Sequence, residues 1–352
     1  MALIVLLVLF QLGSFASGAP LAPALFIFGD SLVDGGNNNF LPTHAQANYK
    51  PYGANFAAGT TGRFTNGKTV ADFIAEFLGL PYVPPSMSAK DSIPVTGLNY
   101  ASGSCGILTE TGKQFGKCLS LDDQIGSFEA AVKTKLPKQF SSSNELFNYL
   151  SNSIYLFSVG SNDYIVNYLD PTSESSKHYT PQQFALLLTD KLSQSLQRLY
   201  NLGARKIVVF ELGPIGCMPG LARKNEVQVE KCMEKANQLV SFFNKNLGAM
   251  LQSLRTTLPA SKFVNGYAYW LSYDAISNPS KYGLTDSSNP CCTTAAHGSS
   301  VCIPNQPTCP NPGKFYFFDA YHPTEAANSI LASRCINDKS VCSPPLNGLV
   351  KM

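Results

Sequence analysis

The chain has 352 residues and a net charge of +3, and only 14% of its residues are charged, against roughly 25% in an average soluble protein. With 44% hydrophobic residues it is too apolar for a disordered protein. No block of Lys or Arg stands out, so we do not expect a nucleic-acid partner. Length alone would allow two domains, but no linker divides the chain, and we predict a single domain for residues 19–352.

Residues 1–18 have the pattern of a secretory signal peptide. The apolar run Ala2–Phe10 is shorter than the roughly 20 residues that a membrane span needs. Ala16 and Gly18 are spaced as at a cleavage site before Ala19. No Lys or Arg precedes the apolar run, so an uncleaved N-terminal anchor is the alternative. We predict a secreted, extracellular protein with no membrane span once the signal is removed.

Ten cysteines fit a protein from an oxidising compartment, and the even number allows all of them to pair. Zinc binding is the rival interpretation, but no pair has CxxC spacing and no group of histidines accompanies them. We therefore predict disulfides, with a connectivity that the sequence leaves open. The cysteines are Cys105, Cys118, Cys217, Cys232, Cys291, Cys292, Cys302, Cys309, Cys335 and Cys342.

Several short apolar segments end in turn residues and predict the strands of a parallel sheet. They are nearly continuous in hydrophobicity and do not alternate, as expected of strands that are buried on both faces. The segments are residues 24–30, 97–103, 153–163, 204–214 and 262–270.

Helical patterns lie between these strands. One covers residues 69–80 and another covers residues 229–258. The best marked has Thr180 as its N-cap and Pro181 at its first helical position, and it ends at Gly203. The alternation of strands and helices implies a layered α/β fold.

Residues 274–318 interrupt this alternation. The region is rich in Pro, Gly and Cys, and it contains four of the ten cysteines. We predict a long loop here that is pinned by disulfides.

Polar stretches follow three of the predicted strands, where ligands bind in open parallel sheets. They contain Ser31, Gly103 and Asn162. Such clusters are usually ordinary turns, and Ser31 lacks the GxSxG elbow of α/β hydrolases. A serine nucleophile would also need donors for an oxyanion. The candidates are the backbone N–H groups of Ser31 and Gly103 and the side-chain amide of Asn162.

One of the four histidines has an acidic residue three positions away. This is His322, which Asp319 precedes. An Asp at this spacing can accept the Nδ1 proton, fix the tautomer and stabilise the imidazolium. Alternatively, Asp319 caps a helix that Pro323 opens, beside a surface histidine. The spacing does not decide between the two. The other histidines are His44, His178 and His297.

Four short blocks follow one another along the chain, and they read FGDSLVDGGNNN, NYASG, VGSNDY and DAYHP. Further distinctive segments are TGRFTNGKTVADFIAEFLGLP, GARKIVVFELGPIGCMP and the CC-containing loop. In these segments the chain resembles the GDSL esterase/lipases, also called SGNH hydrolases, and most closely their secreted plant branch. The resemblance covers essentially the whole mature chain, with the four family blocks in order, and it implies a three-layer α/β/α, flavodoxin-like fold with a five-stranded parallel sheet.

The resemblance also implies catalytic roles. It makes Ser31 the nucleophile, His322 the general base and then acid, and Asp319 the orienting carboxylate. It makes Gly103 and Asn162 oxyanion donors, together with the N–H of Ser31.

The second block departs from the family pattern. It reads ASGSCG where relatives often have two glycines, so the N–H of Ser104 is an alternative donor to that of Gly103. Asp30 and Asp34 could suggest a cation-binding loop, but the EF-hand spacing is absent. We expect these two carboxylates to order the turn.

We therefore predict a monomeric carboxylic ester hydrolase that works through an acyl-enzyme on a small-molecule ester or lipid. No metal or organic cofactor is expected. The same residues would serve an acyltransferase that passes the acyl group to an alcohol. A catalytically inactive extracellular binding or defence protein on the same fold is the third alternative.

Overall fold

The computed structural model describes residues 19–89, 93–222, 231–295 and 300–352. The predicted signal peptide, the first residues of the helix predicted over 229–258, and His297 lie outside this part of the chain. Within it, no helix combines the length and the hydrophobicity that crossing a membrane requires.

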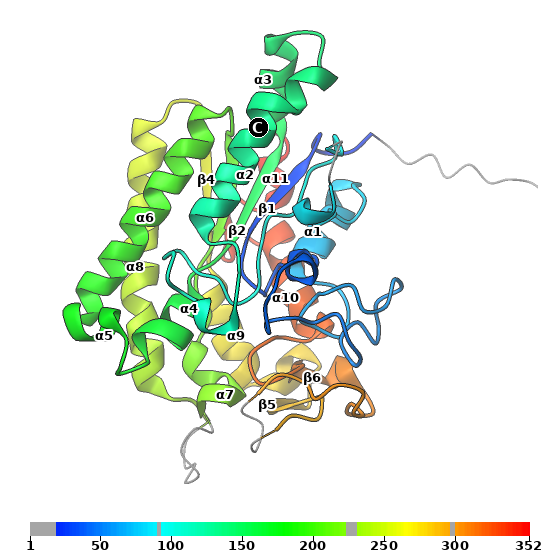
Figure 1. Cartoon of the computed structure of the whole chain (residues 1–352), viewed down its shortest axis with the longest axis vertical. Helices are drawn as coiled ribbons and strands as arrows, with labels where there is room; N and C mark the ends of the chain where they lie inside the picture. Colours follow the sequence, from blue (N-terminus) through cyan, green and yellow to red (C-terminus); the bar gives the residue numbers. More distant parts are fainter. Residues whose placement is uncertain (1–18, 90–92, 223–230, 296–299) are drawn as a thin grey trace, which may run out of the picture.

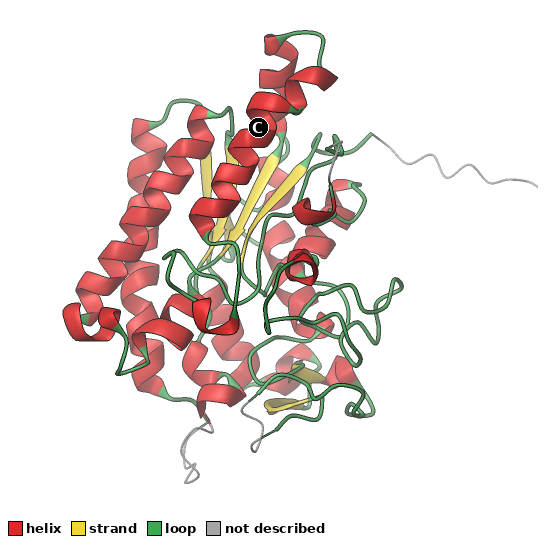
Figure 2. Ribbon diagram, in the orientation of Figure 1, coloured by secondary structure: helices red, strands yellow, loops and turns green. Residues whose placement is uncertain are grey.

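A five-stranded sheet forms the centre of the protein (Figures 1 and 2), in the order β1-β2-β3-β4-β7. The first four strands are parallel, and the short β7 pairs antiparallel to β4. The strands are β1 (Leu25–Gly29), β2 (Ile154–Ser158), β3 (Lys206–Phe210), β4 (Lys262–Gly266) and β7 (Cys342–Ser343).

The strand predicted at 97–103 is not a regular strand, but it runs parallel along the outer edge of β1. The N–H of Ile27 donates to the carbonyl of Leu98 at 3.1 Å, and the N–H of Tyr100 donates back to Ile27 at 2.7 Å. The side chain of Asn99 also binds the turn after β1, where its Nδ2 donates to the carbonyl of Val33 at 2.7 Å. Four of the five predicted strands are therefore β1 to β4, and β7 is the fifth member of the sheet.

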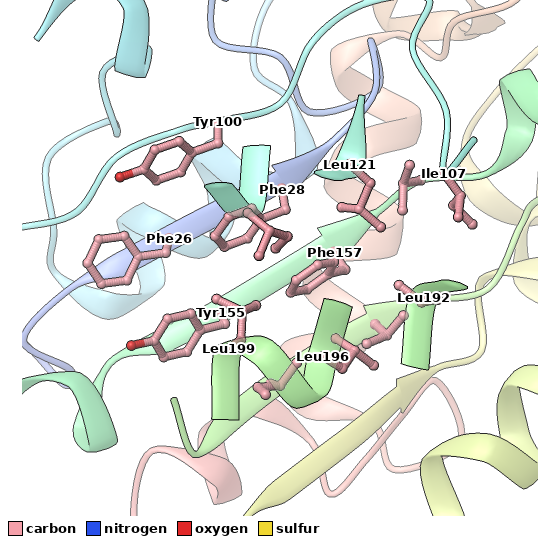
Figure 3. Packing of buried hydrophobic residues seen from close by; sticks show 14 of the residues in the cluster. Phe26, Phe28, Tyr100, Ile107, Leu121, Tyr155, Phe157, Leu192, Leu196 and Leu199 are labelled. Atoms are coloured by element: carbon pink, nitrogen blue, oxygen red, sulfur yellow. The ribbon is translucent and has the colours of Figure 1, made fainter. Parts of the chain in front are cut away.

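Helices cover both faces of the sheet and give three layers. Successive strand residues point to opposite faces. Phe26, Phe28 and Phe157 pack with α2, α6 and α8 (Figure 3), whereas Leu25 and Ile27 pack with α1, α10 and α11. These helices are α2 (Leu121–Thr134), α6 (Pro181–Asn201), α8 (Glu234–Thr257), α1 (Val70–Leu78), α10 (Glu325–Asn337) and α11 (Leu346–Leu349).

Shorter elements lie beside these layers. The described part of the region predicted to be a long loop contains a helix end, two 3₁₀ turns and a two-stranded parallel sheet, so that prediction was too coarse. The remaining helices and strands are α3 (Ser143–Asn152), α4 (Ser161–Asp163), α5 (Glu174–His178), α7 (Pro219–Ala222), α9 (Ala268–Ser277), β5 (Asp286–Pro290) and β6 (Phe315–Phe317).

The helix ends follow the capping residues. Thr180 caps α6 as predicted: its side chain accepts the N–H of Gln183, and Pro181 is the first helical residue. The helix after His322 starts two residues later than predicted, at Glu325, because Thr324 and not Asp319 caps it.

All ten cysteines form disulfides, as predicted. The pairs are Cys105–Cys118, Cys217–Cys232, Cys291–Cys309, Cys292–Cys302 and Cys335–Cys342. Among the described residues, one His/Cys/Asp/Glu group is compact enough to hold a metal ion, at Cys217, Cys232 and Glu234. Its two sulfur atoms are bonded to each other, so they offer no thiolate.

Candidate active site

The carboxyl ends of β1 and β2 bring the predicted site residues to one place. Ser31 follows β1 by two residues, and Asn162 lies in α4, directly beyond β2. Both line a cleft of about 280 Å³ together with Ser104 and His322, which we call the catalytic cleft. Segments far apart in the sequence thus meet at the edge of the sheet where α/β proteins bind ligands.

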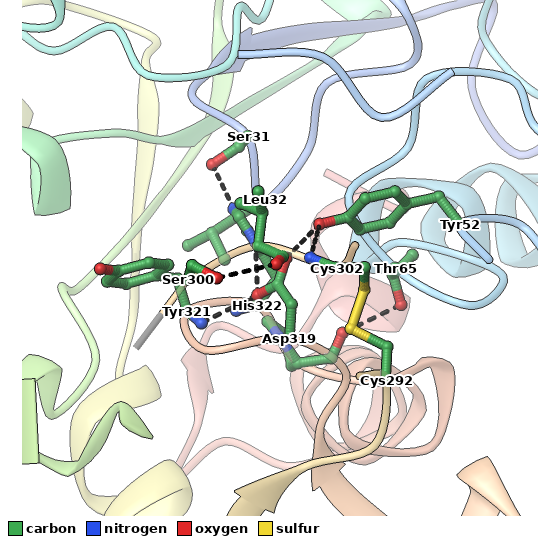
Figure 4. Close-up of polar contacts among 12 residues, drawn as sticks. Ser31, Leu32, Tyr52, Thr65, Cys292, Ser300, Cys302, Asp319, Tyr321 and His322 are labelled. Atoms are coloured by element: carbon green, nitrogen blue, oxygen red, sulfur yellow. Dashed lines mark hydrogen bonds and ion pairs between the residues drawn. A yellow bond between two sulfur atoms is a disulfide. The ribbon is translucent and has the colours of Figure 1, made fainter. Parts of the chain in front are cut away.

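Ser31, His322 and Asp319 form a continuous hydrogen-bonded row (Figure 4). The Oγ of Ser31 lies 2.8 Å from Nε2 of His322, and Nδ1 of His322 lies 2.8 Å from Oδ2 of Asp319. The carboxylate only accepts, so it fixes the proton on Nδ1 and leaves Nε2 to accept from the serine hydroxyl. All three residues are buried, and Asp319 is fully enclosed.

Asp319 is surrounded by donors. Its Oδ1 accepts the N–H groups of Tyr321 and His322, each at 2.8 Å, and its Oδ2 accepts the hydroxyl of Tyr52 at 2.5 Å. Burial raises the pKa of Asp319, but the charge of His322 and the hydrogen bonds from His322, Tyr52 and the backbone outweigh it, so the net pKa lies below its usual value. The carboxylate of Asp319 therefore stays ionised. It contacts His322 and does not cap the following helix, which was the alternative interpretation.

Tyr52 was not found from the sequence. Its hydroxyl also accepts the N–H of Cys302 at 3.3 Å, which ties the carboxylate of Asp319 to the disulfide-linked loop (Figure 4). The ring is buried and packs edge-on against Phe64 and Phe318. No sequence signal links a tyrosine to an aspartate 267 positions away, so only the fold reveals this contact.

The strand end before the nucleophile is held on two sides. The side chain of Gln124 on α2 accepts the N–H of Gly29 and donates to its carbonyl, both at 2.9 Å. On the other side, β1 and β2 approach so closely that a Cβ at Gly29 would lie 2.3 Å from the carbonyl oxygen of Ser158. Glycine is required at this position because any side chain would push the two strand ends apart.

Asp30 precedes the nucleophile and is buried. Its Oδ1 accepts the N–H of Leu32 at 3.0 Å, and its backbone N–H donates to Ser158 at 3.0 Å. Burial raises its pKa to about 7. Together with Asp34, it orders the turn as predicted.

Asp34 links the first and second blocks. Its Oδ1 accepts the N–H groups of Gly36 and Asn37 at 2.7 and 2.8 Å, and its Oδ2 accepts the N–H of Gly103 at 3.0 Å. Burial raises the pKa of Asp34 to about 6, although these backbone donors lower it. The predicted oxyanion donor Gly103 thus already uses its N–H within the protein.

The asparagine side chains of the first block bind residues 99–103 of the second block. Nδ2 of Asn37 donates to the carbonyls of Asn99 and Ala101, both at 2.8 Å. Nδ2 of Asn38 donates to the carbonyl of Gly103 at 2.9 Å, and its Oδ1 accepts the hydroxyl of Ser102 at 2.6 Å. These side chains add to the backbone hydrogen bonds between residues 97–103 and β1.

The residue after Gly103 occupies a different position. Ser104 has φ of 67°, in the left-handed region, and it lines the catalytic cleft. Its backbone N–H, like that of Ser31, makes no hydrogen bond within the described part of the chain. Asn162 also lines the cleft, and its Nδ2 donates to the carbonyl of Cys105 at 3.0 Å. Ser31, Ser104 and Asn162 therefore line the same cleft.

Asp163, next to Asn162, anchors the loop that carries Ser104. Its carboxylate accepts the N–H groups of Ile107 and Leu108 at 2.8 and 3.0 Å and the hydroxyl of Thr111 at 2.8 Å. The side chain is buried, and burial raises its pKa to about 6. The VGSNDY block thus provides both a cleft residue and the support for the opposite wall.

Two other histidines belong to the described residues, His44 and His178, and neither is part of this row. His44 lines the catalytic cleft, and His178 is exposed on α5, where its Nδ1 lies 2.9 Å from the carbonyl of Glu174. The cleft is otherwise mainly apolar, with Phe64, Phe115 and Val301 among its walls. It could therefore accept the hydrocarbon part of a ligand.

The sequence model of the GDSL-like lipase/acylhydrolase family matches residues 25–335. The chain belongs to this family. It is 43% identical to GDSL esterase/lipase 7 of Arabidopsis thaliana, over 98% of this chain and 97% of the relative. It is 40% identical to GDSL esterase/lipase At1g71691 of the same plant, over 94% of this chain and 86% of the relative. This GDSL family member is thus a hydrolase of the esterase/lipase type, with esters or lipids as its substrate class.

Solved structures match this GDSL family member at much lower identity. Phospholipase A1 from Streptomyces albidoflavus NA297 is 13% identical, with a TM-score of 0.34, over 93% of this chain and 99% of that one. Protein YXIM_BACsu from Bacillus subtilis is 10% identical, with a TM-score of 0.35, over 91% of this chain and 56% of that one.

Proposed function

We propose that residues 19–352 form the mature, monomeric domain of a secreted carboxylic ester hydrolase that works through an acyl-enzyme on Ser31. The observation that carries this proposal is the hydrogen-bonded row from Ser31 through His322 to Asp319, at the carboxyl ends of the sheet. Secretion is supported by the pairing of all ten cysteines, because disulfides persist in oxidising compartments.

In the first half-reaction, the hydroxyl oxygen of Ser31 attacks the ester carbonyl carbon while Nε2 of His322 takes the hydroxyl proton. The imidazolium that forms lies against Asp319, whose charge offsets the new positive charge. Burial strengthens this interaction because little water screens it.

The negative charge on the substrate oxygen needs donors that are already in place. We assign this role to the N–H groups of Ser31 and Ser104 and to the side-chain amide of Asn162. The N–H of Gly103 donates to Asp34, so in this proposal Gly103 positions the loop of Ser104.

The first half-reaction ends when Nε2 of His322 gives the proton taken from Ser31 to the leaving alcohol, which breaks the ester bond and leaves the acyl group on Ser31. In the second half-reaction, a water molecule attacks that acyl group. His322 takes a proton from this water and returns it to Ser31 when the acid leaves. Every proton transfer in the cycle passes through one nitrogen atom.

The direct test is the Ser31→Ala variant, assayed on p-nitrophenyl acetate. We expect kcat to fall by roughly 10⁴-fold or more, because the nucleophile is lost while the fold is kept. Ser127→Ala is a matched control, since Ser127 lies on the exposed side of α2 and its hydroxyl bonds only Asp123. A fluorophosphonate probe should label the wild type and the control but not Ser31→Ala. Wild-type turnover by Ser31→Ala would refute the proposal.

A further inference from the structure

A second cavity lies behind the catalytic cleft, between α9, α10 and the carboxyl ends of the first three strands. It encloses about 90 Å³, and we call it the inner cavity. Its walls are mainly hydrocarbon, with Phe210, Leu271, Ile276, Phe317 and Leu331 among them. A polar or charged molecule would find few partners there, whereas an alkyl chain would lose its contact with water.

The inner cavity adjoins the catalytic centre. Leu32, Ser161, Met218 and Tyr321 line both it and the catalytic cleft, so they form the partition between the two spaces. Leu32 is the neighbour of Ser31. The longer side chains of this partition are half-buried, so rotation of one of them would join the two spaces.

We propose that the inner cavity binds the end of the substrate's acyl chain, which makes esters of medium-length straight-chain fatty acids the preferred substrates. This inference rests on the acyl-enzyme proposed above. The inner cavity has room for roughly three groups of the size of a water molecule, at about 30 Å³ each. An acyl chain that passes the partition would fill the inner cavity with roughly its last three carbons.

The two halves of an ester have different needs in this site. The alcohol leaves at the end of the first half-reaction, and the catalytic cleft, which His44, Gln46 and Ser300 also line, gives it a path outwards. The acyl chain stays attached to Ser31 until water attacks, so an apolar pocket beside Ser31 would hold the chain in a fixed position. The one carboxyl group at the wall, Glu211, accepts the N–H of Tyr269 at 3.3 Å.

The expected selectivity follows from burial. Each methylene group moved from water into an apolar cavity should raise kcat/KM by about fourfold. Three such groups give roughly 60-fold. The octanoate ester should therefore be hydrolysed far more efficiently than the acetate ester of the same alcohol.

The Gly213→Leu variant tests this selectivity by filling the inner cavity. Gly213 lines the cavity, and a Cβ placed there would meet no atom within 4 Å. Gly126→Leu on α2 is the matched control, because Gly126 is equally open but lines neither space. The measurement is the ratio of kcat/KM for p-nitrophenyl octanoate to that for the acetate. Gly213→Leu should lower this ratio at least tenfold, and the control should leave it unchanged.

A second variant works in the opposite direction. Leu331→Ala lengthens the cavity at α10, so the preferred acyl chain should become longer by about three carbons. This variant keeps the inference testable should Gly213→Leu fail to fold. Thermal unfolding of each purified variant shows whether it is folded.

The outcomes separate this inference from the proposed function. Unchanged chain-length ratios in folded Gly213→Leu and Leu331→Ala would overturn the acyl pocket while leaving Ser31 as the nucleophile. A series of acetate esters of alcohols of increasing length gives a second check. If Gly213→Leu discriminates against long alcohols and not against long acyl groups, the assignment of the inner cavity to the acyl chain is also overturned. A wild-type protein that hydrolyses no ester and resists fluorophosphonate would instead refute the catalytic proposal.

Discussion

The hydroxyl of Tyr52 offers a test of how Asp319 is supported. The Tyr52→Phe variant removes one donor to Oδ2 of Asp319 and keeps the buried ring with its contacts to Phe64 and Phe318. A hydrogen bond to a charged group contributes roughly 1.5–3 kcal/mol. We therefore expect the free energy of unfolding at neutral pH to fall by about 2 kcal/mol.

Catalysis should change much less than stability. The hydroxyl of Tyr52 bonds Asp319 both before and during proton transfer, so its loss affects the ground state and the transition state alike. The contact between Asp319 and His322 is kept. We expect kcat/KM for p-nitrophenyl acetate to fall by less than about tenfold.

The stability difference should depend on pH. The pKa of Asp319 is lowered in the folded protein, so its contribution is present above the unfolded value of 3.8 and is lost as the pH falls through the lower folded value. Losing the donor from Tyr52 raises that folded pKa. The difference between wild type and Tyr52→Phe should thus be largest at neutral pH and shrink below about pH 4.

Urea unfolding at several pH values, together with ester kinetics, checks these expectations. Tyr155→Phe is the matched control, since its buried hydroxyl donates to the carbonyl of Leu150 at 2.9 Å and the variant should lose only about 1 kcal/mol. A Tyr52→Phe variant as stable as wild type would refute the reasoning. A fall in kcat/KM of more than about 10³ would do so too, because it would place Tyr52 in the proton transfer itself.

Two further substitutions test the supports of the site. Asn162→Ala should lower kcat by roughly 10²- to 10³-fold with little change in the melting temperature, as expected for an oxyanion donor, and an undiminished kcat would remove Asn162 from that role. Gly29→Ala should destabilise the protein by about 1–3 kcal/mol, because its Cβ would lie 2.3 Å from the carbonyl of Ser158. Gly126→Ala on α2 should stabilise slightly, by about 0.4–1 kcal/mol, and equal melting temperatures for the two alanine variants would contradict the close approach of β1 and β2.

The helices and strands that could be predicted are marked by their own residues, through apolar runs or helix-capping residues. Strands β1 to β3 are nearly continuous apolar runs, and α6 has both a capping threonine and a proline at its first position. The two-residue strand β7 was missed because it is too short to show any periodicity. Residues 97–103 were predicted as a strand because they are apolar, but asparagine side chains provide much of their hydrogen bonding.

The candidate site was predictable where strand ends and short spacings mark it. Ser31, Asn162 and the pair Asp319 and His322 were expected in one place and do lie together. The contacts of Asp34 with Gly103, and of Tyr52 with Asp319, join residues 69 and 267 positions apart. Local sequence patterns contain no information on such pairs, because the distance between them is set only when the layers pack.

The disulfides of this protein are all local. Their partners are 7 to 18 residues apart, so no covalent cross-link joins the segment of Ser31 to that of His322. Each bond can form while its own loop is exposed, without waiting for the sheet to assemble. We expect mispairing chiefly among Cys291, Cys292, Cys302 and Cys309, where one bridge is nested inside another. We therefore expect oxidative folding to proceed in independent local steps, with isomerase needed chiefly for that nested pair.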